Sequence, residues 1–138
     1  MLTFTFRELK RAWENSSSIF DEATNKTNAH RLLLFYAVEV GLKALVLKRA
    51  HQTDTEGRFE EIKHDLNKLI DILRIGNEFR LIEDIQLSAL KYPERPRNKK
   101  IGDLNQIWRY GAEAKQPADR ELEQQLLKIQ EKIRGELK

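Results

Sequence analysis

Cysteine is absent from this 138-residue chain, which excludes disulfide bonds and thiolate zinc sites. Proline and glycine are scarce, with three and six residues, as suits long helices joined by short connections. The longest apolar run falls short of a membrane span, so no membrane partner is expected. The N-terminal residues lack a basic stretch followed by an apolar core, so no signal peptide is expected either. A cytoplasmic location is the resulting expectation.

Length and charge set further bounds. We expect one domain, 1–138, which is long enough to bury a core without disulfides or a metal ion. There are 25 Lys and Arg residues against 22 Asp and Glu residues, which gives a formal net charge of +3. Because tight nucleic-acid binders concentrate positive charge on one face, the distribution of these residues matters more than their total.

The most apolar stretch, residues 32–48, predicts a helix that is hydrophobic on nearly every face and lies in the middle of a bundle. A glycine inside a helix costs about 1 kcal/mol relative to alanine. Gly41 therefore predicts that a neighbouring helix approaches closely. Glu39 is the only acid in the stretch, and we expect it at the rim of the core, paired with Lys43 one turn later, in preference to a buried functional role.

Apolar residues at three- and four-residue steps predict the other helices. The polar residues 51–63 predict a loop, and the two prolines and clustered basic residues of 92–102 predict a linker. The Thr-Phe-Thr-Phe segment before the first helix alternates like a strand and is interpreted as an ordered leader or a pairing arm. The predicted helices span 6–25, 28–50, 65–75 and 78–91, with a short helix after Asp103 and a last helix from about Pro117.

The last predicted helix carries a narrow apolar seam with four-three-four spacing. The seam is too short for a free coiled coil, and we expect it to dock on the bundle. The predicted fold class is all-α, an up-and-down antiparallel four-helix bundle with an additional short helix. The residues expected to face the core are Leu122, Leu126, Ile129 and Ile133 in the seam, and Phe79, Ile82, Ile85 and Leu90 or Ala89 in the helix over 78–91.

Three short motifs follow one another along the chain: aromatic-Ala-Val-Glu-x-x-Leu-Lys-Ala-Leu, then His-Asp-Leu with a further leucine, then Tyr-Pro. Their residues are Tyr36, Ala37, Val38, Glu39, Leu42, Lys43, Ala44 and Leu45, then His64, Asp65, Leu66 and Leu69, then Leu90, Tyr92 and Pro93. In this order the chain resembles the HEPN domain family over about residues 25–95.

The resemblance implies an up-and-down four-helix bundle, usually a dimer. Some members of the family are metal-independent ribonucleases of toxin–antitoxin and defence systems, with an Arg-x4–6-His motif. Others lack the motif and act as the substrate- or nucleotide-binding partner of a minimal nucleotidyltransferase. The ribonuclease motif often reads Arg-Asn-x-x-x-His near the start of the last core helix. This chain has Arg97-Asn98 there with no histidine after it, so the imidazole expected to move the 2′-hydroxyl proton is missing.

Arg58 and His64 do fit an Arg-x5-His pattern, but they lie between two predicted helices, where the family does not place its motif. They are the candidate catalytic pair, and our prediction is that the chain has no catalytic site. His64 at a helix start also suits capping, a bond to a neighbouring helix, or lining a pocket. Asp65 is interpreted as a charge at a helix N-terminus. His30, His51 and His64 lack the spacing of a metal site, and we expect neither metal nor cofactor.

The basic segment from Lys91 to Lys100 is the best candidate for binding a partner. Its arginines and lysines suit contacts to phosphates, and Tyr92 suits stacking on a base, joined by Trp108 or Tyr110. The alternative interpretation is a solvated loop with ordinary charges. Trp13 and Trp108 are interpreted as core or interface residues. The residues predicted to bind a nucleotide or RNA are Lys91, Tyr92, Arg95, Arg97, Lys99 and Lys100.

Three hypotheses of function follow. The first is a non-catalytic HEPN-like bundle that forms a homodimer and binds a nucleotide, RNA or a nucleotidyltransferase partner. The second is a metal-independent ribonuclease of a toxin–antitoxin or defence system with a diverged site, for which Arg58 and His64 are the candidates. The third is a protein–protein adaptor that assembles through its C-terminal helix and the 122–133 seam.

Overall fold

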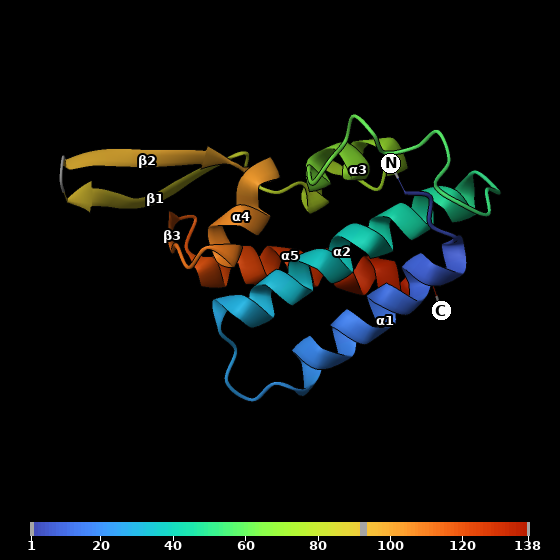
Figure 1. The fold of residues 1–138 in the computed structure, drawn as a ribbon, viewed down its shortest axis with the longest axis horizontal. Helices are drawn as coiled ribbons and strands as arrows, with labels where there is room; N and C mark the ends of the chain where they lie inside the picture. Colours follow the sequence, from blue (N-terminus) through green and yellow to red (C-terminus); the bar gives the residue numbers. More distant parts are fainter. Residues whose placement is uncertain (1, 92–93, 138) are drawn as a thin grey trace.

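Three long helices form the body of the molecule, and a β-hairpin projects from one end of it (Figure 1). The computed structural model describes residues 2–91 and 94–137. The long helices are α1 (Phe6–Glu22), α2 (Asn28–Arg49) and α5 (Asp119–Leu137). The described residues also form two shorter α-helices and a three-stranded antiparallel sheet, so the prediction of an all-α four-helix bundle is wrong.

Helix α2 lies at the centre of the core, as its apolar sequence predicts. Most of its residues between Leu34 and Leu47 are buried, and it packs against both α1 and α5. A Cβ atom at Gly41 would lie 2.8 Å from Trp13 Cδ1 on α1 and 2.9 Å from Ile133 Cγ2 on α5. The close approach predicted at this glycine is therefore confirmed, and three helices meet there.

Helix α5 runs in the same direction as α2. Asn28 and Asp119 are hydrogen-bonded at the first ends of the two helices, and Arg49 and Glu136 form an ion pair at their last ends. The intervening chain, residues 50–118, therefore returns along the length of the body and carries the two shorter helices and the sheet (Figure 1). The seam predicted on this helix faces α2, and its members Leu122, Leu126, Ile129 and Ile133 are each 0% exposed.

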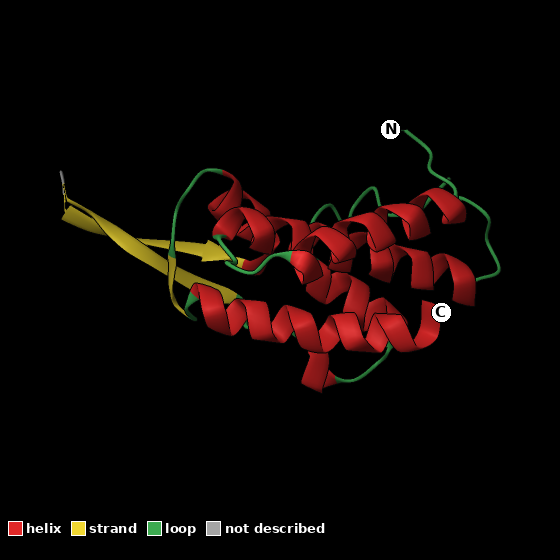
Figure 2. Ribbon diagram, turned by 90° about the horizontal axis from the view of Figure 1, so that it is seen from below, coloured by secondary structure: helices red, strands yellow, loops and turns green. Residues whose placement is uncertain are grey.

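The sheet occupies the region that was predicted as a fourth helix and a linker. Its strands are β1 (Asp84–Lys91), β2 (Glu94–Lys100) and β3 (Ala114–Gln116), in the order β2-β1-β3. Only a 3₁₀ turn, η1 (Asn77–Phe79), is helical within 78–91. Figure 2 shows the long, twisted β1–β2 hairpin reaching past the ends of the helices.

The sequence of β1 explains why it forms a strand, because its buried and exposed residues alternate. Ile85 and Leu87 are buried while Gln86 between them is exposed, which is the two-residue period of a strand with one buried face. Ile82, expected in the core, is 49% exposed. Strand β2 lies at an edge of the sheet, and an edge tolerates Pro96 because the missing N–H need not bond a neighbour.

Two shorter helices complete the fold. Helix α3 (Leu66–Leu73) begins at Asp65, whose side chain accepts a hydrogen bond from Asn67 N at 3.1 Å, so the interpretation of Asp65 as a charge at a helix start is confirmed. The helix is capped at its C-terminal end by Arg74, which has a φ of 52°, close to the predicted end at residue 75. A 3₁₀ turn, η2 (Ile101–Asp103), leads into helix α4 (Leu104–Arg109).

The loop over 51–63 is confirmed, and the N-terminal leader pairs with it. Thr5 forms an isolated antiparallel bridge with Asp54. Phe6 N donates to Thr53 O at 2.8 Å, and Thr55 N donates to Phe4 O at 2.9 Å. The alternating leader is therefore a pairing arm, as one of its two interpretations proposed.

Candidate functional site

The basic residues predicted to bind a partner lie on the β1–β2 hairpin rather than on a linker. In the antiparallel register, Arg97 lies opposite Leu87 and Lys99 lies opposite Ile85. Directly opposite residues share one face of a sheet, so Arg97 and Lys99 lie on the face that also carries these buried side chains. This face turns toward helix α4.

The remaining predicted residues are distributed differently. Lys100 follows Lys99 and so lies on the other face, where its ammonium is hydrogen-bonded to Asp84 on β1. That hydrogen bond raises the pKa of Lys100 above its usual range. The backbone of Lys91 pairs with Glu94, and that of Arg95 pairs with Leu90. Tyr92, predicted to stack on a base, lies outside the described residues.

A cavity of about 170 Å³ lies where the hairpin meets α4. Arg97 and Lys99 contribute two cationic side chains to its wall, and Tyr110 contributes an aromatic ring that is 76% exposed. Arg97 Nε donates to Ser88 O at 2.9 Å, where the register of β1 shifts, and no hydrogen bond from its other guanidinium N–H groups is found among the described residues. The complete lining is Leu87, Arg97, Lys99, Asp103, Gln106, Ile107, Tyr110 and Ala112.

Two polar residues of this wall were not among the predicted binding residues. Asp103 precedes α4, and Gln106 lies within it. The hydrogen bonds and ion pairs found within the described parts of the chain include no side-chain partner for either residue. In the sequence, Asp103 carried only the signal of a helix cap, and Gln106 carried no signal, because their place in the cavity depends on the hairpin folding over them.

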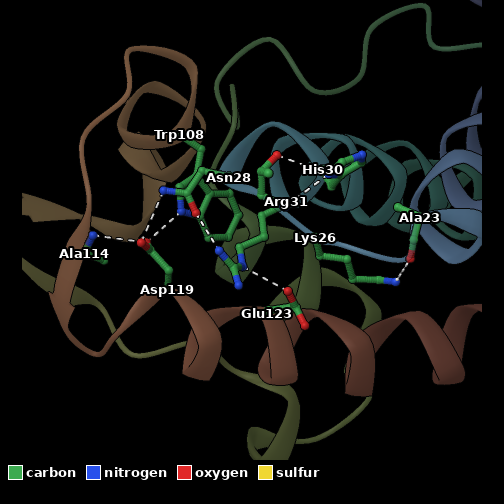
Figure 3. A network of polar contacts seen from close by, with 10 residues as sticks. Ala23, Lys26, Asn28, His30, Arg31, Trp108, Ala114, Asp119 and Glu123 are labelled. Atoms are coloured by element: carbon green, nitrogen blue, oxygen red, sulfur yellow. Dashed lines mark hydrogen bonds and ion pairs between the residues drawn. The ribbon is translucent and has the colours of Figure 1, made fainter.

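A polar network fixes α4 to the long helices (Figure 3). Asp119 lies at its centre and accepts hydrogen bonds from Trp108 Nε1 at 2.8 Å, from Ala114 N at 3.0 Å and from Asn28 Nδ2 at 3.2 Å. These donors come from α4, β3 and α2, so one carboxylate ties three elements to the start of α5. Because charge-assisted hydrogen bonds are stronger than neutral ones, this arrangement holds the cavity wall in place.

The network continues along α2 and α5. Arg31 Nη1 donates to Asn28 Oδ1 at 2.8 Å, and Arg31 Nε donates to Glu123 Oε1 at 2.9 Å. Trp108 on α4 is only 3% exposed, whereas Tyr110, directly after α4, is accessible to a ligand. The interpretation of Trp108 as a core residue is confirmed.

A second polar cluster joins α2 to the loop before α3. Glu39 is 6% exposed, and each of its carboxylate oxygens has a partner: Lys43 Nζ lies 2.8 Å from Oε2, and His64 Nδ1 lies 2.9 Å from Oε1. The predicted pairing with Lys43 is present, but Glu39 is buried rather than at the rim. A carboxylate only accepts, so His64 donates through Nδ1, and its half-exposed ring has Nε2 left for another contact.

The structure does not join Arg58 to His64. Arg58 Nε donates to Gln52 Oε1 at 2.6 Å, within the loop that precedes α3, whereas His64 is held by Glu39. His30 is used locally, because its Nδ1 accepts a hydrogen bond from Thr27 N at the start of α2. Within residues 2–91 and 94–137, no three His, Asp or Glu side chains gather as a metal site would require.

A larger cavity, of about 590 Å³, lies at the opposite end of the body. It is lined by the start of α1, the end of α2 and the loop after α2, including Phe6, Leu47 and His51. None of the residues predicted to bind a nucleotide or RNA lines it. The hairpin cavity is therefore the one lined by residues predicted to bind a nucleotide or RNA.

No helix in the described part of the chain has the length and apolar character needed to span a membrane.

Comparison with protein-family models, with curated proteins and with solved structures found no match for this chain. The site must therefore be interpreted from its own chemistry: two cations, an exposed aromatic ring, a carboxylate and an amide around one small cavity.

Proposed function

We propose that this chain binds single-stranded RNA at the cavity between the hairpin and α4. The observation that carries the proposal is the convergence of Arg97, Lys99 and Tyr110 on that cavity. Arginine and lysine are the residues that contact nucleic-acid phosphates most often, and exposed aromatic rings stack on unpaired bases. The hairpin adds further positive charge, with five basic residues against two acidic ones over 84–100.

The shape of the hairpin agrees with this function. It extends beyond the helices (Figures 1 and 2), and Lys99 on β2 is exposed, so an RNA strand can reach it. A single strand of RNA laid along β2 would meet Lys99 and Arg97 in succession, because alternate residues of a strand share a face. The bases are then free to stack on Tyr110.

The test is the affinity for a labelled single-stranded RNA of mixed sequence, measured by fluorescence anisotropy between about 50 and 200 mM salt. We expect the affinity to fall with salt. Because each phosphate contact adds about 0.7 to the slope of log K against log salt, Arg97→Ala/Lys99→Ala should lower the slope by about 1.4. Lys10→Ala/Arg11→Ala removes the same charge from the start of α1, at the far end of the molecule, and should leave the slope unchanged (Figure 1).

Stacking is tested separately at Tyr110. Tyr110→Ala should weaken binding by about 1–3 kcal/mol, the usual contribution of one stacked base, while Tyr110→Phe retains most of the affinity. The ring is 76% exposed, so neither change disturbs the core. RNA binding that is equally strong in the Arg97/Lys99 and Lys10/Arg11 variants would place the binding surface elsewhere and refute the proposal.

A ribonuclease centre at His64 is a second candidate, favoured by one observation: its imidazole is half-exposed and oriented through Nδ1 by a buried carboxylate, as in many acid–base catalysts. The test is RNA cleavage by the purified chain in EDTA, with His64→Ala and His30→Ala alongside. Cleavage lost only in His64→Ala would establish this activity. Cleavage by none of the three proteins would leave RNA binding without catalysis.

The resemblance to the HEPN family, with the homodimer and the nucleotidyltransferase partner that it implies, remains part of this proposal. Glu39 from the first motif and His64 from the second contact each other, which gives the two motifs one shared structural role. Sedimentation of the purified chain tests the dimer, and the proteins that co-purify with it test the partner.

A further inference from the structure

The carboxylate of Asp103 is the feature of the cavity that phosphate binding does not explain. It lines the same wall as Arg97 and Lys99, and a negative charge there repels a phosphate. Aspartate before a helix ordinarily accepts a hydrogen bond from the first turn. Asp103 makes no such bond, and the hydrogen bonds and ion pairs known for residues 2–91 and 94–137 give its side chain no other partner.

The carboxylate of Asp103 is partly buried and can only accept hydrogen bonds, so a ligand that fits this cavity should carry hydrogen-bond donors. Among the edges of unpaired RNA bases, guanine alone presents two adjacent donor groups, N1–H and the exocyclic N2–H₂, which match the two oxygens of one carboxylate. Adenine and cytosine present one amino group beside an acceptor, and uracil presents one N–H between two acceptors. Unpaired bases are commonly recognised along this edge.

We propose that the cavity selects guanine, with Asp103 as the residue that determines specificity; this inference rests on the RNA-binding function proposed above. Asp103 accepts from N1–H and N2–H₂ of the base. The amide of Gln106, three residues along α4, supplies a donor for O6, and Tyr110 supplies the stacking surface. Arg97 and Lys99 bind the adjoining phosphate from β2.

The dimensions of the cavity agree with a single base. Its volume of about 170 Å³ lies below the roughly 300–1,000 Å³ of pockets that enclose whole drug-sized ligands. A base therefore enters, while the sugar and phosphate stay at the rim, beside the cations of the hairpin. Ile101 and Leu104, which flank Asp103 in the sequence, are both 0% exposed, so the backbone that carries the carboxylate is anchored in the core.

The experiment compares three short single-stranded RNAs that differ at one position, which holds guanine, inosine or adenine. Inosine is guanine without the N2 amino group, so the ratio of the affinities for guanine and inosine isolates one of the two proposed hydrogen bonds. Since a hydrogen bond to a charged group is a strong one, we expect guanine to bind at least about tenfold more tightly than inosine.

Two variants of Asp103 test whether this residue causes the preference for guanine over inosine. Asp103→Ala should bring the guanine-to-inosine ratio close to one, and Asp103→Asn should do the same, because one of its two acceptor positions becomes a donor. Both changes should weaken the binding of the guanine RNA, which loses its hydrogen bonds to Asp103, and should slightly tighten the binding of the adenine RNA, because they remove a negative charge. Asp84→Asn removes an equal charge from the same hairpin, outside the cavity lining, and should leave the ratio unchanged.

The outcomes separate the two proposals. RNA binding with equal affinity for guanine and inosine overturns guanine selection and leaves RNA binding standing. A guanine preference that survives in Asp103→Ala overturns the assignment to Asp103. No binding of any of the three RNAs at low salt overturns the proposed function and this inference with it.

Discussion

Gly41→Ala provides the sharpest test of the packing at the centre of the molecule. In an ordinary helix this change stabilises by about 1 kcal/mol. Here the added methyl would lie 2.8 Å from Trp13 and 2.9 Å from Ile133. Those side chains are 3% and 0% exposed, so neither can move into solvent to make room.

The expected magnitude follows from the two opposing effects. Overpacking a core by one methyl group costs about 1–3 kcal/mol, and contacts below 3.0 Å to two buried side chains place this site in the upper half of that range. After the helix-propensity gain is subtracted, Gly41→Ala should lower the free energy of unfolding by about 1–2 kcal/mol. For a chain of 138 residues, that lowers the melting temperature by about 3–7 °C.

Thermal unfolding followed by circular dichroism measures the effect, and Gly135→Ala is the matched control. Gly135 is also in a long helix, but beyond its own helix backbone and chain neighbours no heavy atom of the described residues lies within 4 Å of its would-be Cβ, so alanine should stabilise there by about 0.5–1 kcal/mol. In Gly41→Ala/Ile133→Ala the two changes should be less than additive, because the smaller residue makes room for the methyl. A Gly41→Ala protein that melts at or above the wild-type temperature would refute the three-helix contact.

The remaining predictions concern the polar network, the seam and a helix cap. Asp119→Ala should lower the free energy of unfolding in urea by about 3 kcal/mol, because it leaves the buried indole N–H of Trp108 without an acceptor. The fluorescence of Trp108 should also show that its side chain has become more exposed to solvent. An unchanged midpoint would contradict the role of this network. Leu126→Asp should abolish the helical circular dichroism of the monomer, since that side chain is 0% exposed; an assembly that dissociates with its helices intact would instead restore the adaptor hypothesis. The pKa of Glu8 is lowered by the hydrogen bond from the Thr5 backbone, so its contribution to stability is present above its usual pKa and is lost as the pH falls through the lowered value. Glu8→Gln should therefore flatten the fall in melting temperature below about pH 4.3, and an equally steep fall in the variant would count against this cap.

The long helices and their central glycine could be predicted from the sequence because their signals are local. The apolar residues of α2 repeat within one element, and a glycine in such a stretch has few explanations other than close packing. The same reasoning is correct for the start of α3, where Asp65 bonds backbone groups only two and three residues away.

The hairpin could not be predicted in this way. Residues 84–89 alternate between polar and apolar, which is a strand pattern, but Phe79, Ile82 and Ile85 also fit a helix at three-residue steps. The partner strand β2 is almost entirely polar, so it lacks the alternation of polar and apolar residues from which a strand is predicted, and its proline favours a linker. Residues 94–100 form a strand only because they pair with β1, and such pairing cannot be predicted from the sequence of either segment alone.

The candidate site shows the same limit. Arg97, Lys99 and Tyr110 were recognisable as basic or aromatic residues, but their meeting at one cavity depends on the hairpin folding back over α4. The role of Asp119 was hidden for a related reason: its donor on α2, Asn28, lies 91 positions away in the chain.

The shared direction of α2 and α5 has a consequence for the order in which the chain assembles. Helices α1 and α2 are neighbours in sequence and can pair soon after they form, whereas α5 docks only once residues 50–118 have closed into a loop. The carboxylate that secures α4 sits on the first turn of α5, so the hairpin end of the molecule becomes ordered only after that late docking. We therefore expect amide hydrogens of α4 and β3 to exchange faster than those of α2, which makes the proposed binding surface the last part to form and the first to open.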